Sequence, residues 1–135
     1  MNYPRVTVIL PAYNAEAYIL ESVNSVLSQT YSDFILMVID DGSIDKTFNI
    51  LSEIRDKRLL LLKNDKNMGL VNTLNRGLRE SQSEYIARMD ADDISCPTRL
   101  EKQLDFLDKN KDYGLCGTWG KSFDGDKAEI MPPTD

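Results

Sequence analysis

Short apolar runs alternate along this chain with segments in which apolar side chains recur every three or four residues. The apolar runs have the length of buried strands, and they occupy residues 6–10, 34–39, 59–62, 85–89 and 113–119, with β-branched residues most frequent in the first two. Segments of helical periodicity follow the first four of them, at about 15–29, 45–54, 70–78 and 97–107. Asn14 is the expected N-cap of the first helix. After residue 120 the pattern predicts no further element.

This alternation predicts an α/β fold. Strands that are apolar throughout and separated by helices are typical of a Rossmann-like, mostly parallel sheet with helices on both faces. Three polar segments follow predicted strands, at residues 11–14, 40–43 and 90–93. Because such sheets bind ligands at the carboxyl ends of their strands, we expect these segments to meet at one rim and form a binding site.

The last polar segment brings three carboxylates together, those of Asp90, Asp92 and Asp93. Carboxylates this close repel one another, and a divalent cation with oxygen ligands is the simplest partner that would stabilise them. The chain has no histidine, which excludes a histidine-based zinc or acid–base site. Two other interpretations stay open. Acids favour helix N-termini, and a calcium loop has similar spacing, although Ser95 replaces the glycine that such a loop needs.

Further candidates lie beside these segments. Tyr13 either offers a flat face to a base ring or is an ordinary surface aromatic. Arg88 either neutralises the neighbouring carboxylates or reaches a phosphate. The spacing of Asn67 and Gly69 predicts a turn in which Gly69 has a positive φ. The chain contains neither a P-loop nor a Gly-x-Gly-x-x-Gly loop, which argues against a P-loop nucleotidase and an ordinary NAD enzyme.

Composition narrows the choice of partners. The chain has 135 residues and a net charge of −6, which argues against a nucleic-acid partner. Its cysteines, Cys96 and Cys116, are isolated, which indicates a reduced, cytoplasmic compartment. No apolar run approaches the ~20 residues that span a bilayer, and the first residues lack the layout of a signal peptide.

Linked motifs in this chain resemble the nucleotide-sugar-binding portion of family-two glycosyltransferases of the A-type fold. The similarity runs in order and without large gaps through residues 6–14, 25–30, 38–47, 84–93 and 97–103. The resemblance implies a transferase that depends on a nucleotide sugar, usually a UDP-sugar, and acts on a glycan or lipid-linked acceptor. Such enzymes usually build bacterial surface polysaccharides and invert the anomeric configuration.

The same resemblance implies roles for residues of the first two polar segments. Pro11, Ala12 and Tyr13 would line the base pocket, with Tyr13 packing on uracil. Asp41, the second acid of its pair, would accept a hydrogen bond from the uracil ring. These positions match the family's motifs residue by residue.

In the third polar segment, the resemblance implies that Asp92 ligates Mn²⁺ or Mg²⁺ directly. Asp90 would lie near the ribose and the water shell of the metal, and would count as a second metal-site residue. Arg88 belongs with the nucleotide-binding residues. The metal would offset the charge that develops on the leaving diphosphate.

Length separates this chain from the family it resembles. Family members carry an acceptor-binding portion after this region, and their general base, usually a carboxylate, lies there. We therefore expect a nucleotide-sugar-binding domain at residues 1–120. Residues 121–135 would begin an acceptor-side region or a loose tail, and the general base would lie beyond Asp135. The expected location is the cytoplasm, including a peripheral position at the inner face of the membrane.

Two alternative functions stay open. The chain could be a module that binds a nucleotide sugar without transferring it. It could also be a receiver-like signalling domain, although its first strand ends in Pro-Ala-Tyr and offers no carboxylate to the acidic site that a receiver needs.

Overall fold

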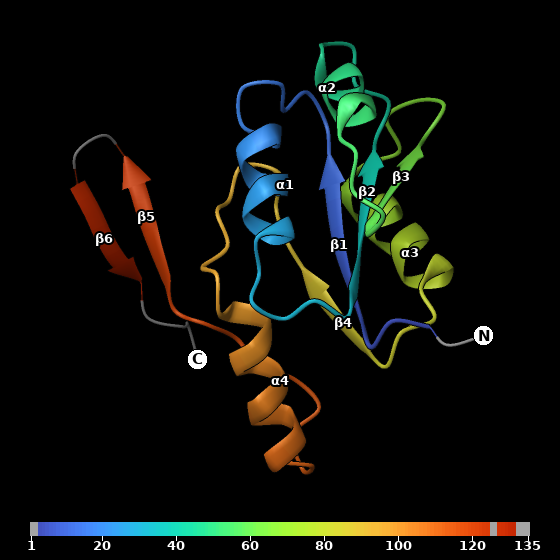
Figure 1. The fold of residues 1–135 in the computed structure, drawn as a ribbon. Coiled ribbons are helices and arrows are strands. Elements are labelled where there is room, and N and C mark those ends of the chain that lie inside the picture. The colour runs from blue at the N-terminus through green and yellow to red at the C-terminus, as the bar shows by residue number, and fades with distance from the viewer. Residues whose placement is uncertain (1–2, 125–126, 132–135) are drawn as a thin grey trace.

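A computed structural model describes residues 3–124 and 127–131. Four parallel strands form its main sheet, in the order β3-β2-β1-β4 (Figure 1). The strands are β1 (Val6–Ala12), β2 (Phe34–Asp40), β3 (Leu59–Lys63) and β4 (Tyr85–Arg88). The helices are α1 (Ile19–Leu27), α2 (Thr47–Glu53), α3 (Leu70–Glu80) and α4 (Arg99–Lys109). The predicted Rossmann-like α/β fold is confirmed.

Helices cover both faces of this sheet. On one face, α1, α2 and α4 pack against the buried side chains of Val6, Val8 and Leu10 in β1. On the other face, α3 approaches β1 closely, because a Cβ atom at Gly77 would lie 2.7 Å from Ile9 Cγ2. The connections from β1 to β2 and from β2 to β3 run in one direction across the sheet, and the connection from β3 to β4 runs in the other. Because such crossovers are right-handed, α1 and α2 lie on one face and α3 lies on the opposite face.

The direction of winding reverses at β1. From β1 the chain proceeds to β2 and β3 on one side, and it returns through α3 to β4 on the other. β1 and β2 pair as far as Ala12 opposite Asp40, whereas β4 ends with Arg88 opposite Ile9. The carboxyl ends of β1 and β4 therefore flank the switch point, where open α/β sheets bind their ligands.

The first helix begins later than predicted. α1 starts at Ile19, and its N-cap residue, Tyr18, makes no capping hydrogen bond with its side chain. Asn14 has a φ of 49°, and its Oδ1 accepts a hydrogen bond from the N–H of Ile44 at 3.0 Å. The prediction that Asn14 caps the helix is wrong, because its side chain joins two turns instead.

The last predicted strand is also wrong. Residues 113–119 form no strand, while β5 (Gly120–Asp124) and β6 (Lys127–Met131) pair antiparallel in a separate sheet where the sequence predicted no element. A strand needs a neighbour to satisfy its backbone groups. Within the described residues, segment 113–119 instead contacts α4, where Gln103 Nε2 donates to the carbonyl oxygen of Cys116 at 3.2 Å.

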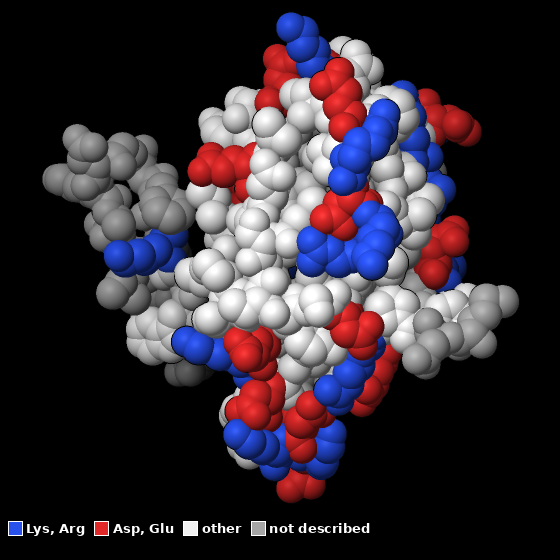
Figure 2. Space-filling model, viewed as in Figure 1, with Lys and Arg blue, Asp and Glu red and all other residues white. Residues whose placement is uncertain are grey.

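Surface charges of both signs gather over α4, at the lower end of the view in Figure 2. Ion pairs there join Lys109 to Asp105, and both Lys111 and Arg5 to Asp108. The last of these pairs ties the end of α4 to the segment that leads into β1. Among the described helices, none combines the length and the apolar character needed to cross a bilayer.

Candidate functional site

The first two polar turns lie side by side at the carboxyl ends of β1 and β2. The N–H of Asp41 donates to the carbonyl oxygen of Ala12 at 2.8 Å, and the N–H of Asn14 donates to Ser43 Oγ at 3.0 Å. These bonds fix the backbone on either side of Tyr13, which is 45% exposed. The aromatic ring is thus available at the rim, as stacking on a base requires.

The Asp41 carboxylate is buried and holds the loop that follows β3. Its Oδ1 accepts hydrogen bonds from Asn64 Nδ2 at 2.7 Å and from the N–H of Met68 at 2.8 Å. Its Oδ2 accepts from the N–H of Gly69 at 2.9 Å. Burial by itself would raise the pKa of Asp41, but these hydrogen bonds outweigh it and hold that pKa below its usual value. Asp41 is therefore an ionised group that only accepts hydrogen bonds.

Gly42 lets the loop at residues 64–69 approach the turn at residues 40–43. Its φ is 72°, and a Cβ atom there would lie 2.6 Å from the carbonyl carbon of Lys66. Glycine alone accommodates both the backbone conformation and this contact. Gly69, at the end of the same loop, has a φ of 85°, which confirms the predicted positive φ. The turn after β2 and the loop after β3 form one packed unit.

Polar side chains from the α1 region hold the acidic segment, residues 90–93, and the residues that connect it to α4. Ser22 Oγ donates to the carbonyl oxygen of Asp90 at 3.1 Å, and the N–H of Ser95 donates to Ser25 Oγ at 2.9 Å. Gln29 Nε2, just beyond the helix, donates to Ser95 Oγ at 3.2 Å. Because α1 packs on the sheet, these bonds fix the segment relative to β1 and β4.

The carboxylates of this segment interact with one another and with one arginine. Arg88 Nη2 donates to Asp90 Oδ1 at 2.9 Å, and their side chains are 55% and 46% exposed. Burial and the nearby charges of Asp90 and Asp92 raise the pKa of Asp93. In this state of the protein, Arg88 neutralises a carboxylate, which is one of the two roles that the sequence left open.

This donor set suits a cation that is shared with a ligand. In the part of the chain that the structure describes, no group of three or more acidic, histidine or cysteine side chains is arranged to hold a metal alone. Mg²⁺ is commonly bound by one or two carboxylates together with substrate phosphates. Asp92 is exposed, and Asp90 lies two residues away, so the residues present fit that mode of binding.

The structure brings most predicted site residues to one rim. Pro11 and Ala12 are buried at the end of β1, Tyr13 follows them, and Asp41 lies at the end of the adjacent β2. The acidic segment follows β4 on the opposite side of β1, where the N–H of Met89 donates to the carbonyl oxygen of Ile9 at 3.0 Å. The three polar segments thus follow three adjacent strands.

The residues that orient these segments received no role from the sequence. They are buried or half-buried polar side chains: Ser22, Ser25, Gln29, Asn64 and Thr73. The first three recur at helical spacing and form a polar stripe beside the apolar stripe of α1, which was the available signal. Asn64 offered no comparable signal, because its partners depend on how a loop packs.

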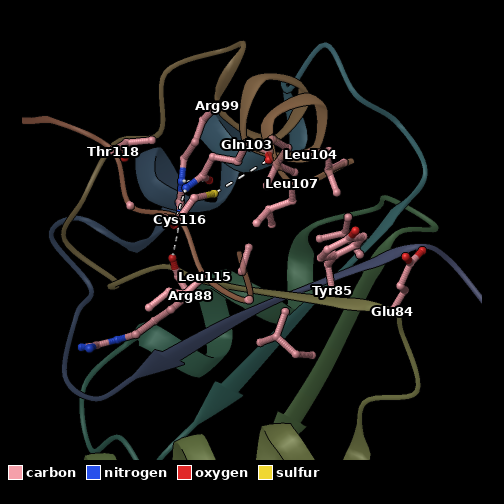
Figure 3. A pocket seen from close by; sticks show the side chains of 16 residues that line it. Glu84, Tyr85, Arg88, Arg99, Gln103, Leu104, Leu107, Leu115, Cys116 and Thr118 are labelled. Carbon is pink, nitrogen blue, oxygen red and sulfur yellow. Dashed lines mark hydrogen bonds between the residues drawn. The ribbon is translucent and has the colours of Figure 1, made fainter. Parts of the chain in front are cut away.

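A cavity of about 530 Å³ lies against β4, between that strand, α4 and residues 114–118 (Figure 3). Arg99 Nη2 donates to the carbonyl oxygen of Arg88 at 2.8 Å across one end of it. The apolar part of its lining is built from leucines: Leu100, Leu104, Leu107 and Leu115. The cavity adjoins the acidic segment through Arg88 but includes no residue of the three polar segments.

Proteins of known sequence that are similar to this chain carry glycosyltransferase names. An uncharacterized glycosyltransferase of Haemophilus influenzae is 46% identical over 120 residues, covering 87% of this chain and 37% of the relative. Escherichia coli WfgD, named UDP-Glc:alpha-D-GlcNAc-diphosphoundecaprenol beta-1,3-glucosyltransferase, is 40% identical over 114 residues. The match covers 84% of this chain and 45% of that relative. The chain therefore spans well under two thirds of the length of these relatives.

Solved structures with this fold include nucleotide-sugar complexes. S. aureus TarS 1-349 in complex with UDP-GlcNAc has a TM-score of 0.75 and 31% identity, covering 79% of this chain and 32% of that one. The mannosyltransferase PcManGT from Pyrobaculum calidifontis, in complex with GDP-Man and Mn²⁺, has a TM-score of 0.71 and 28% identity, covering 78% and 33%. The model of the protein family described as Glycosyl transferase family 2 matches residues 7–133 of this chain. This chain belongs to glycosyl transferase family 2.

Proposed function

We propose that this chain binds the donor in a metal-dependent, inverting transfer of a sugar from a UDP-sugar to a glycan or lipid-linked acceptor. The reaction would serve the synthesis of a bacterial surface polysaccharide, in the cytoplasm or at the inner face of the membrane. The observation that carries the proposal is the placement of the three polar segments after three adjacent parallel strands, around the switch point beside β1.

The base of the nucleotide would lie over the turns that follow β1 and β2. Tyr13 supplies an exposed aromatic face for stacking, and Pro11 and Ala12, which are buried at the end of β1 just before it, would line the base pocket. Asp41 is ionised and only accepts hydrogen bonds, so it suits a ring N–H of the base. The UDP-GlcNAc complex of TarS supports a uracil nucleotide as the ligand class.

The diphosphate would lie toward the acidic segment. Asp92 would share a divalent cation, Mn²⁺ or Mg²⁺, with the phosphates, and Asp90 would lie close to it. Such a cation neutralises negative charge on the leaving diphosphate when it is bound. Arg88 pairs with Asp90 at 2.9 Å and carries donors that a phosphate oxygen could also use. The Mn²⁺ in the PcManGT complex supports this choice of cation.

The proposed class of acceptor is supported by the names of relatives and not by the residues at the carboxyl ends of the strands. The name of E. coli WfgD specifies a sugar on diphosphoundecaprenol as its acceptor, which supports a lipid-linked acceptor here. Inversion requires in-line attack by a deprotonated acceptor hydroxyl, and we assign that base to none of the described residues. The general base is expected beyond Asp135.

Isothermal titration calorimetry with UDP tests the donor site. UDP should bind in the presence of Mn²⁺ or Mg²⁺ and lose most of its affinity when a chelator removes the metal. Equal affinity with and without the metal would contradict the assignment of Asp92. Absence of any UDP binding would contradict the proposed function itself.

A further inference from the structure

Asn64 connects α3 to the carboxylate of Asp41 through a chain of hydrogen bonds. Its Nδ2 donates to Asp41 Oδ1 at 2.7 Å and to Thr73 Oγ1 at 3.1 Å. Its Oδ1 accepts from Arg76 Nη1 at 2.6 Å, and the same nitrogen donates to the carbonyl oxygen of Lys63 at 2.8 Å. The residues Asp41, Asn64 and Thr73 are 4%, 7% and 0% exposed. Buried groups linked in this way hold one another's orientation, because a rotation would leave several of them unsatisfied.

Arg76 determines which way the amide of Asn64 points. A guanidinium group only donates hydrogen bonds, and an ionised carboxylate only accepts them. With Arg76 on one side and Asp41 on the other, the amide satisfies both neighbours in a single orientation, with its oxygen toward Arg76. Arg76 therefore acts on Asp41 through Asn64 and not by direct contact.

The network leaves Asp41 with limited, directed capacity for a ligand. A carboxylate offers roughly four lone-pair sites, and Asn64, Met68 and Gly69 occupy three of them. Two of these donors bind Oδ1 and one binds Oδ2, so Oδ2 has the greater remaining capacity to accept a hydrogen bond. An acceptor held there matches a base that presents a ring N–H, such as uracil at N3 or guanine at N1. Cytosine and adenine present a lone pair at the equivalent ring position, which a carboxylate repels.

We propose that Asn64 and Arg76 are positioning residues that set the nucleobase selectivity of the donor site, by holding Asp41 as an acceptor for a ring N–H. The inference rests on the proposed function, because it assumes that the base lies beside Asp41. It adds the class of base that is accepted and two residues that neither the sequence motifs nor the comparisons assign. The nucleotides in the TarS and PcManGT complexes, UDP-GlcNAc and GDP-Man, both carry a base of this class.

The test compares UDP with CDP, which differ only at the base, in calorimetric titrations of the full chain with Mn²⁺. A site that hydrogen-bonds a ligand N–H rejects an analogue lacking it strongly, so the wild type should prefer UDP by about 100-fold or more. Asn64→Asp keeps the shape of the side chain but replaces the donor to Asp41 with a second carboxylate. It should lower the UDP-to-CDP affinity ratio by about tenfold or more, because Asp41 loses a donor and gains a repelling charge.

Arg76→Gln should also lower the ratio, because the Asn64 amide loses the donor that fixes it. Arg76→Lys restores a donor and should recover most of the ratio. Asn75→Asp and Arg79→Gln are matched controls, since both residues are exposed on α3 and make the same change of charge. Both controls should keep the wild-type ratio, and thermal melting should show that every variant compared is folded.

Two results would overturn the inference, and they are distinguishable. An unchanged UDP-to-CDP ratio in folded Asn64→Asp and Arg76→Gln would remove the positioning role but leave the proposed function intact. Absence of UDP binding by the wild type would remove both. If Asn64→Asp fails to fold, the pair Arg76→Gln and Arg76→Lys decides: a lowered and then restored ratio supports the role, and no change refutes it.

Discussion

The side-chain amide of Gln29 donates a hydrogen bond to the carbonyl oxygen of Cys96 at 2.7 Å. Its oxygen accepts from the N–H of Leu100 at 3.0 Å, in the first turn of α4. This one side chain, next to α1, therefore holds the residues that follow the acidic segment. It also accepts from an N–H in the first turn of α4, and such an N–H has no partner within its own helix. The acidic segment is fixed at its far end by this residue.

We predict that Gln29→Ala destabilises the protein and loosens the acidic segment. The substitution leaves the buried N–H of Leu100 without its partner and the carbonyl oxygen of Cys96 without this donor, at a cost of about 2–3 kcal/mol in the free energy of unfolding. Urea denaturation measures that loss, and hydrogen exchange at the N–H of Ser95 should accelerate locally. Ser28→Ala is the control, because Ser28 is exposed and should change stability by less than about 0.5 kcal/mol.

Alanine at Gly42 should be more damaging than alanine at Gly69. Both glycines have a positive φ, so each replacement stores backbone strain of about 1–3 kcal/mol. At Gly42 the added Cβ also meets the backbone of Lys66 at 2.6 Å, whereas nothing lies within 4 Å at Gly69. The expected loss in the free energy of unfolding is ~4 kcal/mol for Gly42→Ala and ~2 kcal/mol for Gly69→Ala.

Chemical denaturation of both variants checks this order. Gly114→Ala is a suitable control, because its Cβ would meet nothing within 4 Å and no strained φ is involved. Gly42→Ala should also weaken UDP binding in its folded fraction, since it forces the loop at residues 64–69 away from Asp41. Equal losses for the two variants would show that backbone strain alone matters at Gly42.

The alternation of apolar runs and amphipathic segments was enough to predict the main sheet. Each of the first four strands lies within a residue or two of its prediction, because each coincides with a short apolar run. The run is clearest in β1 and β2, which are buried along almost their whole length. The rim position of Tyr13, Asp41 and Asp92 followed from the rule that loops at the carboxyl ends of parallel strands share one edge. These features depend on local patterns alone.

The remaining features depend on partners that are distant in sequence. The local sequence around Asn14 is typical of a helix cap. Its side chain instead bonds to a backbone N–H 30 residues away, which a local pattern cannot indicate. Segment 113–119 has a strand-like composition but pairs with no strand in the described part of the chain. The three donors to Asp41 come from a loop that packs over Gly42, and no periodicity predicts that contact. Tertiary packing decided these cases.

Acid should weaken the fold through the ion pair between Asp56 and Arg58. Side-chain hydrogen bonds from Arg58, at 2.8 Å and 3.1 Å, and one from its backbone lower the pKa of Asp56 to about 2. The unfolded-state pKa is about 3.9, so the folded state favours the ionised form. This contribution is complete above about pH 5 and is lost as pH falls toward 2. For a partly exposed pair we expect about 1 kcal/mol.

Denaturation of the wild type and Asp56→Asn across pH 2–7 measures this contribution. The variant should be less stable at pH 7, and the difference between the two proteins should shrink toward zero at low pH. Asp65→Asn is the matched control, because Asp65 is exposed and forms no ion pair within the described residues. A difference that stays constant with pH would show that the hydrogen-bond geometry, and not the charge, stabilises this turn.

Asp92→Ala and Asp93→Ala should separate metal binding from simple charge crowding. Asp92 is the proposed metal ligand, so Asp92→Ala should weaken Mn²⁺-dependent UDP binding by about tenfold or more, which is the loss expected for removing a ligand or its support. Asp93→Ala should change that affinity far less. Both substitutions remove one of several crowded carboxylates and relieve repulsion, so neither should lower thermal stability.

Calorimetric titration with UDP and Mn²⁺, paired with thermal melting, measures both the UDP affinity and the thermal stability of the two variants. If Asp92→Ala unfolds the protein while its folded fraction still binds UDP normally, the acids serve the fold as residues at a helix N-terminus, and the metal assignment is wrong.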